Sequence, residues 1–355
     1  MSKPTAADIL NASCPLPIAD HPHVLLSHGG GGRMSQMLVE KMFLSEFDDP
    51  ALAVLHDGAL LDVPAGRIAV STDSFVVRPR FFPGGDIGSL AVHGTVNDVA
   101  MCGATPVAIT CAFVLEEGLP MEELWRIVRS MRAAAAEAGV RIVTGDTKVV
   151  DRGKGDGIYV NTTGIGVLRE GVTVAPKRAA PGDRVLVNGP IAEHGIAIMS
   201  VREGLEFETE LKSDSAALNG LVAALLDELG DAVHVLRDPT RGGVSSATNE
   251  IAQAARVGIR LEEAAIPLTE PVRGACEMLG FDPLYVANEG KLLAFVAPER
   301  AEAALAVMRA HPLGRGAVDI GEVVADHPGR VFLRSRIGGL RVVDMLSGEQ
   351  LPRIC

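Results

Sequence analysis

The amino-acid sequence predicts a two-domain protein of mixed helices and strands. Three observations support this class. The chain has 355 residues, more than one ordinary domain at roughly 150 residues each. Strand-like and helix-like segments alternate through both halves, and the turn Pro181-Gly182-Asp183 separates the halves. Hydrophobic residues make up 47% of the chain, which is enough to fill two cores.

Composition and charge exclude several classes of function. The formal net charge of −12 argues against nucleic acid or an anionic membrane as the main partner. Nucleotides are still possible ligands, because Mg²⁺ can bridge phosphates and acidic side chains. We find no signal peptide and no unbroken apolar run of the ~20 residues that span a bilayer. The expected location is therefore the cytoplasm.

The N-terminal segment, residues 1–23, is predicted to be an extension outside the fold, because it is rich in Pro, Ala and polar residues. A glycine run, residues 29–32, then opens a helix. Such a run can present backbone N–H groups to an anion. It is not a Walker A loop, since no Gly-Lys-Ser/Thr follows. The glycine run is therefore compatible with two roles, a flexible turn or a phosphate contact through Gly30 and Gly31.

Two acidic residues of the first half lie where a charge is costly. Residues 67–77 form a predicted strand with Asp73 in its middle. Residues 88–102 form a predicted helix, in which Asn97 and Asp98 interrupt an apolar run. A buried carboxylate is unfavourable unless it is paired or bound to a metal. Both acids are therefore candidate ligands.

A third candidate site follows a short predicted strand at residues 141–143. This strand ends in Thr144-Gly145-Asp146-Thr147-Lys148. An acidic and a basic residue two apart at a strand end are well placed to hold Mg²⁺ and a phosphate. The other predicted elements of this half are strands at 105–115 and 158–167, the second containing Asn161, and a helix at 120–138.

The second half carries two further acidic positions. Asp238 lies at a strand-to-helix junction, and Glu289 lies in Asn288-Glu289-Gly290-Lys291, which opens a strand. The predicted strands are 184–187, 233–236, 259–261, 292–296 and 331–333, and the predicted helices are 194–202, 213–229, 243–255 and 298–311.

The last residue, Cys355, has no following backbone to shield its sulfur. The thiolate is the reactive form of cysteine. The α-carboxylate of Cys355 disfavours a second negative charge, whereas Arg353 favours it. We predict that residues 337–355 form a flexible tail hinged at Gly338-Gly339, with Cys355 as a portable nucleophile. A terminal cysteine without function is the alternative at this point.

The four aspartates at strand ends or within apolar helices point to one kind of site. A hard cation prefers oxygen ligands, and a metal charge stabilises phosphoryl transfer. The four aspartates are Asp73, Asp98, Asp146 and Asp238. Together they predict a site that binds several Mg²⁺ ions and a triphosphate.

Several motifs occur together in an order that resembles a known superfamily. They are Ser71-Thr72-Asp73-Ser74, Gly94-Thr95-Val96-Asn97-Asp98-Val99-Ala100, Thr144-Gly145-Asp146-Thr147-Lys148, Asp238-Pro239-Thr240-Arg241-Gly242-Gly243 and Asn288-Glu289-Gly290-Lys291. The chain resembles the ATP-dependent superfamily of aminoimidazole ribonucleotide synthetase, selenophosphate synthetase and thiamine monophosphate kinase. Residues 82–88 and the ending Pro-Arg-Ile-Cys narrow the resemblance to the HypE family of hydrogenase maturation proteins, which are carbamoyl dehydratases. The resemblance covers residues 25–355.

The resemblance implies a fold, a reaction and partners. The fold is an α+β, two-domain PurM-like fold with an ATP-binding and dimerisation domain at 24–180, a C-terminal domain at 181–336 and the tail at 337–355. The chain forms a homodimer with the nucleotide at the interface. A carbamoyltransferase, HypF, places a carbamoyl group on Cys355, and ATP drives dehydration to a thiocyanate. The cyanide passes to iron on a HypC-HypD scaffold complex, as a ligand of [NiFe] hydrogenase.

The resemblance also implies roles for the candidate residues. The four aspartates hold Mg²⁺, and Lys148 contacts the transferring phosphoryl group or the activated oxygen. Glu289 orients the carboxamide NH₂ or accepts its proton; a salt bridge with Lys291 or Arg241 is the alternative role of Glu289. The expected nucleotide contacts are Gly30, Gly31, Asn97, Thr144, Gly145 and Asn161.

Two other functions compete with this one. A selenophosphate synthetase-like enzyme also uses ATP and a cysteine, but its reactive residue lies beside the glycine loop, and Cys14 lies too far upstream to match well. A non-catalytic scaffold for metal-centre assembly could use Cys355 and the histidines near the N-terminus. The four aspartates argue against a scaffold, since it needs no nucleotide.

Overall fold

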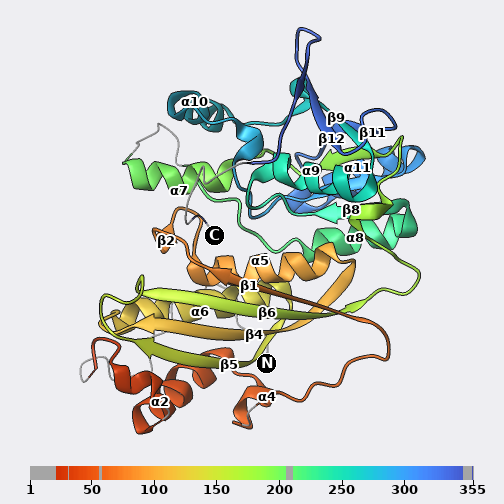
Figure 1. Cartoon of the computed structure of the whole chain (residues 1–355). Coiled ribbons are helices and arrows are strands. Elements are labelled where there is room, and N and C mark those ends of the chain that lie inside the picture. Colours follow the sequence, from red (N-terminus) through yellow and green to blue (C-terminus); the bar gives the residue numbers. More distant parts are fainter. Residues whose placement is uncertain (1–20, 31, 56–57, 205–210, 347–353, 355) are drawn as a thin grey trace.

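Two β-sheets organise the chain, one in each half (Figure 1). The computed structural model describes residues 21–30, 32–55, 58–204, 211–346 and 354. The first sheet has the strand order β1-β6-β4-β5, and the second has the order β13-β12-β9-β11-β7-β10-β8. A small ribbon pairs β2 with β3. The mixed α+β class predicted from the sequence is confirmed.

The first sheet is made of β1 (Ile68–Phe75), β6 (Ile158–Leu168), β4 (Ala104–Glu116) and β5 (Arg141–Val150). The β4–β5 pair is parallel, and the other two pairs are antiparallel. Two helices, α5 (Ile87–Met101) and α6 (Met121–Ala138), pack against each other, and α5 also contacts β1, β6 and β4.

The two faces of this sheet differ in burial, because side chains alternate along each strand. In β1, Ala69 and Phe75 are buried on one face. Ile68 and Val70 point to the opposite face and are 54% and 59% exposed. One face therefore belongs to the core, and the other presents apolar side chains to solvent.

Helix α5 begins at a well-formed N-cap. The Asp86 carboxylate accepts hydrogen bonds from the backbone N–H groups of Gly88 and Ser89, at 2.7 and 3.1 Å. The same oxygen accepts a bond from Ser130 Oγ of α6 at 2.8 Å. Asp86 thus fixes both the start of α5 and its position beside α6.

The second sheet is formed by the C-terminal half of the chain. Its strands are β7 (Arg184–Val187), β8 (Val233–Arg237), β9 (Gly258–Glu262), β10 (Leu293–Val296), β11 (Val318–Val324), β12 (Arg330–Arg334) and β13 (Leu340–Val342). The helices of this half are α7 (Glu193–Glu203), α8 (Asn219–Leu229), α9 (Gly243–Ala255), α10 (Glu270–Leu279) and α11 (Ala301–Ala310).

Short helical segments complete the chain. The N-terminal ones are η1 (Leu26–Gly29), α2 (Arg33–Leu38), the π-helical η2 (Val39–Leu44), α3 (Ser45–Phe47) and α4 (Pro50–Ala53). Single 3₁₀ turns are η3 (Pro176–Arg178), η4 (Gly230–Ala232), η5 (Glu263–Ala265), η6 (Pro283–Tyr285), η7 (Pro298–Arg300) and η8 (Pro312–Gly314).

The predicted limits of the extension and of the tail need correction. Met121 N–H donates to the Pro22 carbonyl, and His23 forms a bridge with Pro120, so residues 22 and 23 are part of the fold. At the other end, Leu340–Val342 is a strand paired with β12. The predicted hinge at Gly338 lies in the turn between these two strands, where its φ is 88°. Residues 1–20, including Cys14, lie outside the described residues.

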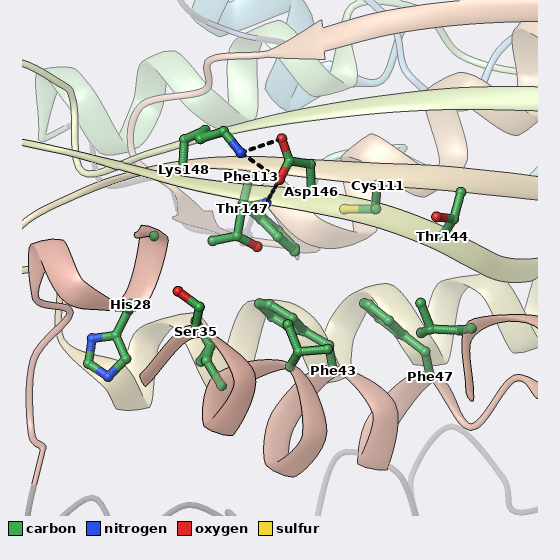
Figure 2. Close-up of a pocket in the computed structure, with 15 residues that line it drawn as sticks. His28, Ser35, Phe43, Phe47, Cys111, Phe113, Thr144, Asp146, Thr147 and Lys148 are labelled. Atoms are coloured by element: carbon green, nitrogen blue, oxygen red, sulfur yellow. Dashed lines mark hydrogen bonds and ion pairs between the residues drawn. The ribbon is translucent and has the colours of Figure 1, made fainter. Parts of the chain in front are cut away.

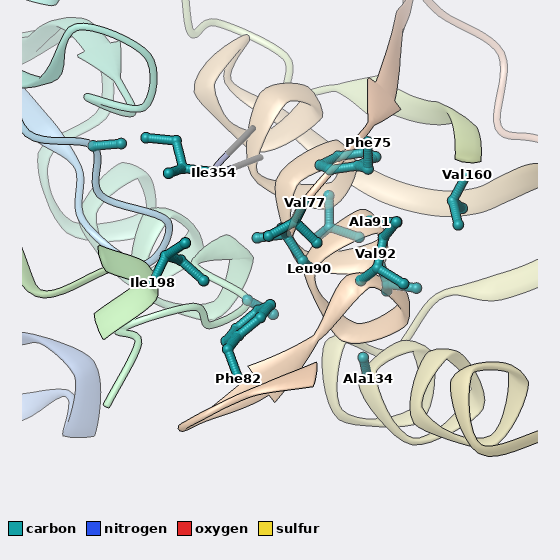
Figure 3. Packing of buried hydrophobic residues seen from close by; sticks show 14 of the residues in the cluster. Phe75, Val77, Phe82, Leu90, Ala91, Val92, Ala134, Val160, Ile198 and Ile354 are labelled. Atoms are coloured by element: carbon teal, nitrogen blue, oxygen red, sulfur yellow. The ribbon is translucent and has the colours of Figure 1, made fainter. Parts of the chain in front are cut away.

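One hydrophobic core joins the two halves. The cluster includes Leu90 of α5, Phe82 of β2 and Ile198 of α7. Ile354, the penultimate residue of the chain, is 5% exposed and belongs to the same cluster. Figure 3 shows Ile354 together with Phe82, Leu90 and Ile198 of this cluster. Ile354 is therefore packed in the core that joins the two domains.

Candidate active site

Carboxylates from both domains meet where the domains join. Asp73 lies on β1 and Asp98 on α5, and Ser71 Oγ donates to Asp98 Oδ2 at 2.8 Å. Asp238 follows the last residue of β8 and is 3% exposed. Glu289 precedes β10 and is 2% exposed. The sequence motifs that supplied these four acids are thus brought together by the fold.

Their pKa values show that the acids interact. Burial raises the pKa of Asp98, and the charge of Asp73 raises it further. Burial and then the charge of Asp98 raise the pKa of Asp238 to about 7. Each carboxylate therefore disfavours ionisation of the next. A bound cation would relieve this repulsion, so the donor set fits Mg²⁺.

Two arginines partly neutralise these carboxylates. Arg237 contacts Asp238 at 3.2 Å, and Arg241 contacts Asp73 at 3.3 Å. Over the residues that the structure describes, no three His, Cys, Asp or Glu side chains lie close enough together to hold one metal ion. The acids therefore lie near one another without forming a closed coordination shell.

Glu289 has the most unusual environment of the site. Burial raises the pKa of its carboxyl well above the ordinary value, followed by the charges of Asp238 and Asp214. Its Oε1 atom is buried without a hydrogen-bond partner among the described residues. An unpartnered buried carboxyl oxygen is costly, which together with the raised pKa makes Glu289 a candidate for contact with a ligand.

Glycine at position 94 makes room for this carboxylate beside α5. A Cβ atom there would lie 3.9 Å from Glu289 Oε2 and only 3.0 Å from Phe75 Cζ. The motif glycine therefore permits the close approach of α5 to β1 and to Glu289.

The salt-bridge alternative for Glu289 is wrong. Lys291 Nζ instead pairs with Glu193 at 3.0 Å and Asp214 at 3.3 Å. Arg241 pairs with Asp73. Lys291 and Arg241 thus form ion pairs with other carboxylates, and neither forms a salt bridge with Glu289.

Asn97 has a structural role that the sequence did not indicate. Its Nδ2 group donates to the carbonyls of Ala216 and Glu289, and its Oδ1 accepts from Leu218 N–H at 2.7 Å. The side chain is 1% exposed. Asn97 therefore joins α5 to the second domain, and the predicted contact with nucleotide is replaced by this bridge.

Asp146 and Lys148 lie apart from the other acids. Strand β5 continues to Val150, so both residues are inside the strand and not at its end as predicted. β1 and β5 are opposite edges of the sheet, separated by two strands, or roughly 14 Å at ~4.8 Å per strand. Mg²⁺ binds oxygen at about 2.1 Å. Asp146 therefore cannot share an ion with Asp73 of the same chain, and the predicted set of four is not brought together within one chain.

Lys148 and Asp146 pair with each other in solvent. Lys148 Nζ lies 2.7 Å from Asp146 Oδ2, and each side chain is 63% exposed. The hydrogen bond from Lys148 lowers the pKa of Asp146. Figure 2 shows both side chains on the side of β5 away from the helical segment that carries Phe43 and Phe47. They point toward the exposed face of the sheet.

A cavity of about 200 Å³ lies between β5 and the N-terminal helical segments. Thr144 and Gly145 line it, together with His28 and Phe113. Asn161 lies on β6 and donates to the Asp73 carbonyl at 2.9 Å and to Ser74 Oγ at 3.0 Å. Gly30 is exposed after η1, and Gly31 is outside the described residues.

The C-terminal tail reaches this junction. His194 Nε2 lies 2.6 Å from the Ile354 carbonyl oxygen. Cys355 itself is outside the described residues. His194 was not among the predicted site residues, because it lies on the apolar helix α7 with no distinguishing motif, and only the fold brings it to the tail.

The described residues contain no helix with the length and apolar character needed to cross a membrane. This agrees with the absence of a long apolar run in the sequence.

The fold and the acidic junction define a protein of the AIR synthase related class. Residues 55–168 match the N-terminal domain of AIR synthase related proteins, and residues 180–334 match the C-terminal domain. The chain is 55% identical over 332 residues to Carbamoyl dehydratase HypE of Azotobacter vinelandii, covering 94% of this chain and 97% of the relative. The chain therefore belongs to the carbamoyl dehydratase HypE family.

Two solved structures support this assignment. HypE in complex with ATP is 52% identical, with a TM-score of 0.90, and the match covers 93% of this chain and 99% of that one. HypE in a HypE-HypF complex is 50% identical, with a TM-score of 0.77, and covers 87% and 99% of the two chains. These relatives favour a carbamoyl dehydratase over a selenophosphate synthetase-like enzyme or a scaffold.

Proposed function

We propose that this protein uses ATP to dehydrate a carboxamide on Cys355 to a thiocyanate. The observation that carries the proposal is the junction of both domains, where the unpartnered Oε1 of Glu289 is buried beside Asp73, Asp98 and Asp238. The last described residue, Ile354, is buried at the same junction. Relatives called carbamoyl dehydratase support the reaction class.

The reaction balances without an oxidant. The amide oxygen of the S-carboxamide takes the γ-phosphoryl group of ATP, and ADP leaves. The carbon–oxygen bond then breaks with phosphate as leaving group, the two N–H protons are lost, and the carbon–nitrogen triple bond forms. Amide oxygen is a poor leaving group, so its conversion to phosphate makes the elimination feasible.

Glu289 is the proposed group that orients the carboxamide NH₂ or accepts one of its protons. A carboxylate with a raised pKa is a stronger base once it is ionised, and positioned general bases contribute about 10²- to 10⁴-fold. Asp73, Asp98 and Asp238 would hold Mg²⁺, which when bound neutralises phosphate charge. Lys148 is the proposed contact to the transferring phosphoryl group or the activated oxygen.

The nucleotide is proposed to bind along β5 and the nearby glycine run. Thr144 and Gly145 line the cavity there. Gly30, Gly31 and Asn161 complete the proposed contact set. A relative of 52% identity has been solved with ATP, which supports ATP as the nucleotide.

A homodimer explains why Asp146 and Lys148 lie far from the other acids. Their side chains point to the exposed face of the first sheet, which also presents Ile68 and Val70. Two copies packed through this face could place Asp146 and Lys148 of one beside the aspartates of the other. We therefore propose that the complete site requires two chains.

The proposed partners follow from the reaction. A HypF-type carbamoyltransferase would supply the carbamoyl group, and a HypE-HypF complex is known for a relative of 50% identity. A HypC-HypD iron scaffold complex would accept the cyanide for [NiFe] hydrogenase. The cytoplasm is the proposed location.

The coupling of ATP to the carboxamide tests this function. Protein carbamoylated on the tail is mixed with ATP and Mg²⁺, and ADP and thiocyanate are quantified. We expect equal amounts of the two products, and little ADP from protein that lacks the carboxamide. ATP hydrolysis at the same rate with and without the carboxamide would contradict the proposal.

A further inference from the structure

The carbonyl of the penultimate residue is held by a buried histidine of the second domain. His194 is fully buried on α7, and its Nε2 lies 2.6 Å from the Ile354 oxygen. On the other side of the ring, Nδ1 lies 2.7 Å from Ser213 Oγ. Both ring nitrogens therefore have partners.

The carbonyl fixes the direction of these hydrogen bonds. A carbonyl oxygen only accepts, so Nε2 must carry the proton that it donates to Ile354. Burial lowers the pKa of His194, which favours the neutral ring. In the neutral ring Nδ1 accepts from the Ser213 hydroxyl, and Ser213 Oγ in turn accepts from Ser215 N–H at 3.1 Å. The resulting chain of donors runs from the backbone of residue 215 to the tail.

Apolar packing supports the same position of the tail. Ile354 is 5% exposed within the core cluster. Phe82 packs edge-on against the His194 ring, with the ring centroids 5.6 Å apart. The ring and the Ile354 side chain are thus held in one apolar setting, which excludes water from the carbonyl contact.

The segment that orients His194 also positions Glu289. Asp214 Oδ1 accepts from Glu289 N–H at 3.1 Å, and Asp214 Oδ2 lies 3.3 Å from Lys291 Nζ. Ser215 Oγ lies 3.0 Å from His93 Nδ1 on α5. Residues 213–215 therefore contact the histidine that holds the tail, the backbone of Glu289 and the helix of Asp98.

We propose that His194 is a positioning residue that docks the tail through the Ile354 carbonyl, and that residues 213–215 align the docked tail with Glu289. The inference deepens the proposed function and rests on Cys355 as the carrier of the carboxamide. His194 acts on the tail and not on the reacting atoms.

The first test measures docking without any reaction. Full-length protein with a free Cys355 thiol is treated with N-ethylmaleimide, and the alkylation rate of Cys355 is followed by peptide mass spectrometry. We expect His194→Phe, which keeps the ring but removes the donor, to speed alkylation about tenfold, as loss of a hydrogen bond allows. His194→Gln, which restores an N–H donor, should return the rate toward wild type.

Two further variants make the result specific. His234→Phe is the matched control, since that ring instead pairs with Asp183 at 2.9 Å, and its alkylation rate should match wild type. Ser213→Ala removes the hydroxyl that orients His194, so it should also speed alkylation of Cys355. It serves as the test variant if His194→Phe does not fold. Wild-type alkylation rates in both His194→Phe and Ser213→Ala would overturn the proposal.

The second test measures the chemical step in a single turnover of carbamoylated protein with ATP. We expect about tenfold slower formation of thiocyanate in His194→Phe, again from one lost hydrogen bond, and recovery in His194→Gln. Faster alkylation with unchanged thiocyanate formation would overturn the positioning role. Faster alkylation in the variant, together with no thiocyanate even from wild type, would support docking and refute the proposed function.

Discussion

Glu289 combines deep burial with an oxygen atom that has no partner among the described residues. A purely structural glutamate in this setting would be expected to pair with a nearby cation, and the neighbouring Lys291 pairs with Glu193 and Asp214 instead. The side chain is therefore held in an unfavourable state that a ligand can relieve.

Replacing Glu289 with Gln tests its role. Glu289→Gln keeps the shape of the side chain but removes its basicity, so thiocyanate formation should fall about 10²- to 10⁴-fold. ATP affinity should change little. Single-turnover mass spectrometry and equilibrium ATP binding measure the two quantities, and a near-normal rate in this variant would rule out proton transfer by Glu289.

Replacing Lys148 should affect the reaction rate but not the stability of the fold. Its pair with Asp146 is largely exposed, and such pairs contribute about 0 to 1 kcal/mol. Lys148→Ala should therefore leave the thermal unfolding temperature nearly unchanged while conversion of carboxamide to thiocyanate falls at least about 10²-fold, as for loss of a transition-state contact. Normal conversion by the folded variant would show that the assigned role is wrong.

The sequence predicted which residues are chemically unusual, but not all of their contacts. Asp98 was found because an acid within an apolar run needs a partner, and Asp238 because it lies at a strand-to-helix junction. Asn97 was assigned to nucleotide, because the sequence could not show that backbone groups from residues 216, 218 and 289 would occupy its amide. His194 carries no local signal, and its role depends on contact with a residue 160 positions away.

At the scale of elements, α5 carries Asp98 and Asn97 and contacts the second domain. Its N-cap at Asp86 is buried, and burial raises the pKa of this carboxyl above its ordinary value of 3.8. The three bonds donated to Oδ1 act in the opposite direction and lower the pKa, but burial is the larger effect.

This gives a pH dependence with a defined sign. Because the folded pKa is raised, Asp86 contributes most to stability below pH 3.8, and part of that contribution is lost as the pH rises through the folded pKa. Asp86→Asn imitates the protonated form, so we expect its stability relative to wild type to increase from pH 4 to pH 8. Urea unfolding at several pH values measures the difference.

Asp86→Ala is the control for this prediction. Like Asn, Ala does not titrate, so the free energy of unfolding of Asp86→Ala should lie below that of Asp86→Asn by about 1 to 2 kcal/mol at every pH, because only Asn keeps a cap. A constant difference between Asp86→Asn and wild type across the pH range would contradict the raised pKa.

Strand β5 shows why element boundaries were the weaker part of the sequence prediction. Its apolar start at residues 141–143 indicated a strand, whereas Thr144-Gly145-Asp146-Thr147-Lys148 was placed at the strand end. The strand continues because β4 pairs with it as far as Glu116 and Val150. Its polar residues are compatible with a strand, since Asp146 and Lys148 face solvent.

At the scale of the whole molecule, one face of the first sheet is exposed among the residues that the structure describes. Ile68 and Val70 are more than half exposed, and Val114 is 36% exposed. A sheet face that carries exposed apolar side chains is a candidate interaction surface. This face is where a second copy would bring Asp146 and Lys148 to the other acids.

Val70→Lys tests the proposed dimer. A charge in the middle of a packed apolar interface is costly, so the variant should be a monomer at concentrations where wild type is a dimer. Sedimentation equilibrium measures the mass, and Asp227→Lys, at a largely exposed position in the second domain, is the control. A wild-type monomer, or a dimer that Val70→Lys leaves intact, would contradict the proposed two-chain site.

The central claim is that the tail cysteine carries the substrate while the acidic junction performs the dehydration. Intact-mass spectrometry tests it most directly, with wild type and Cys355→Ala incubated with the carbamoyltransferase, its carbamoyl donor and ATP. We predict that wild type gains the mass of one carbamoyl group, which is then replaced by that of one cyano group, and that Cys355→Ala gains neither. A carbamoyl or cyano adduct on Cys355→Ala would contradict the account.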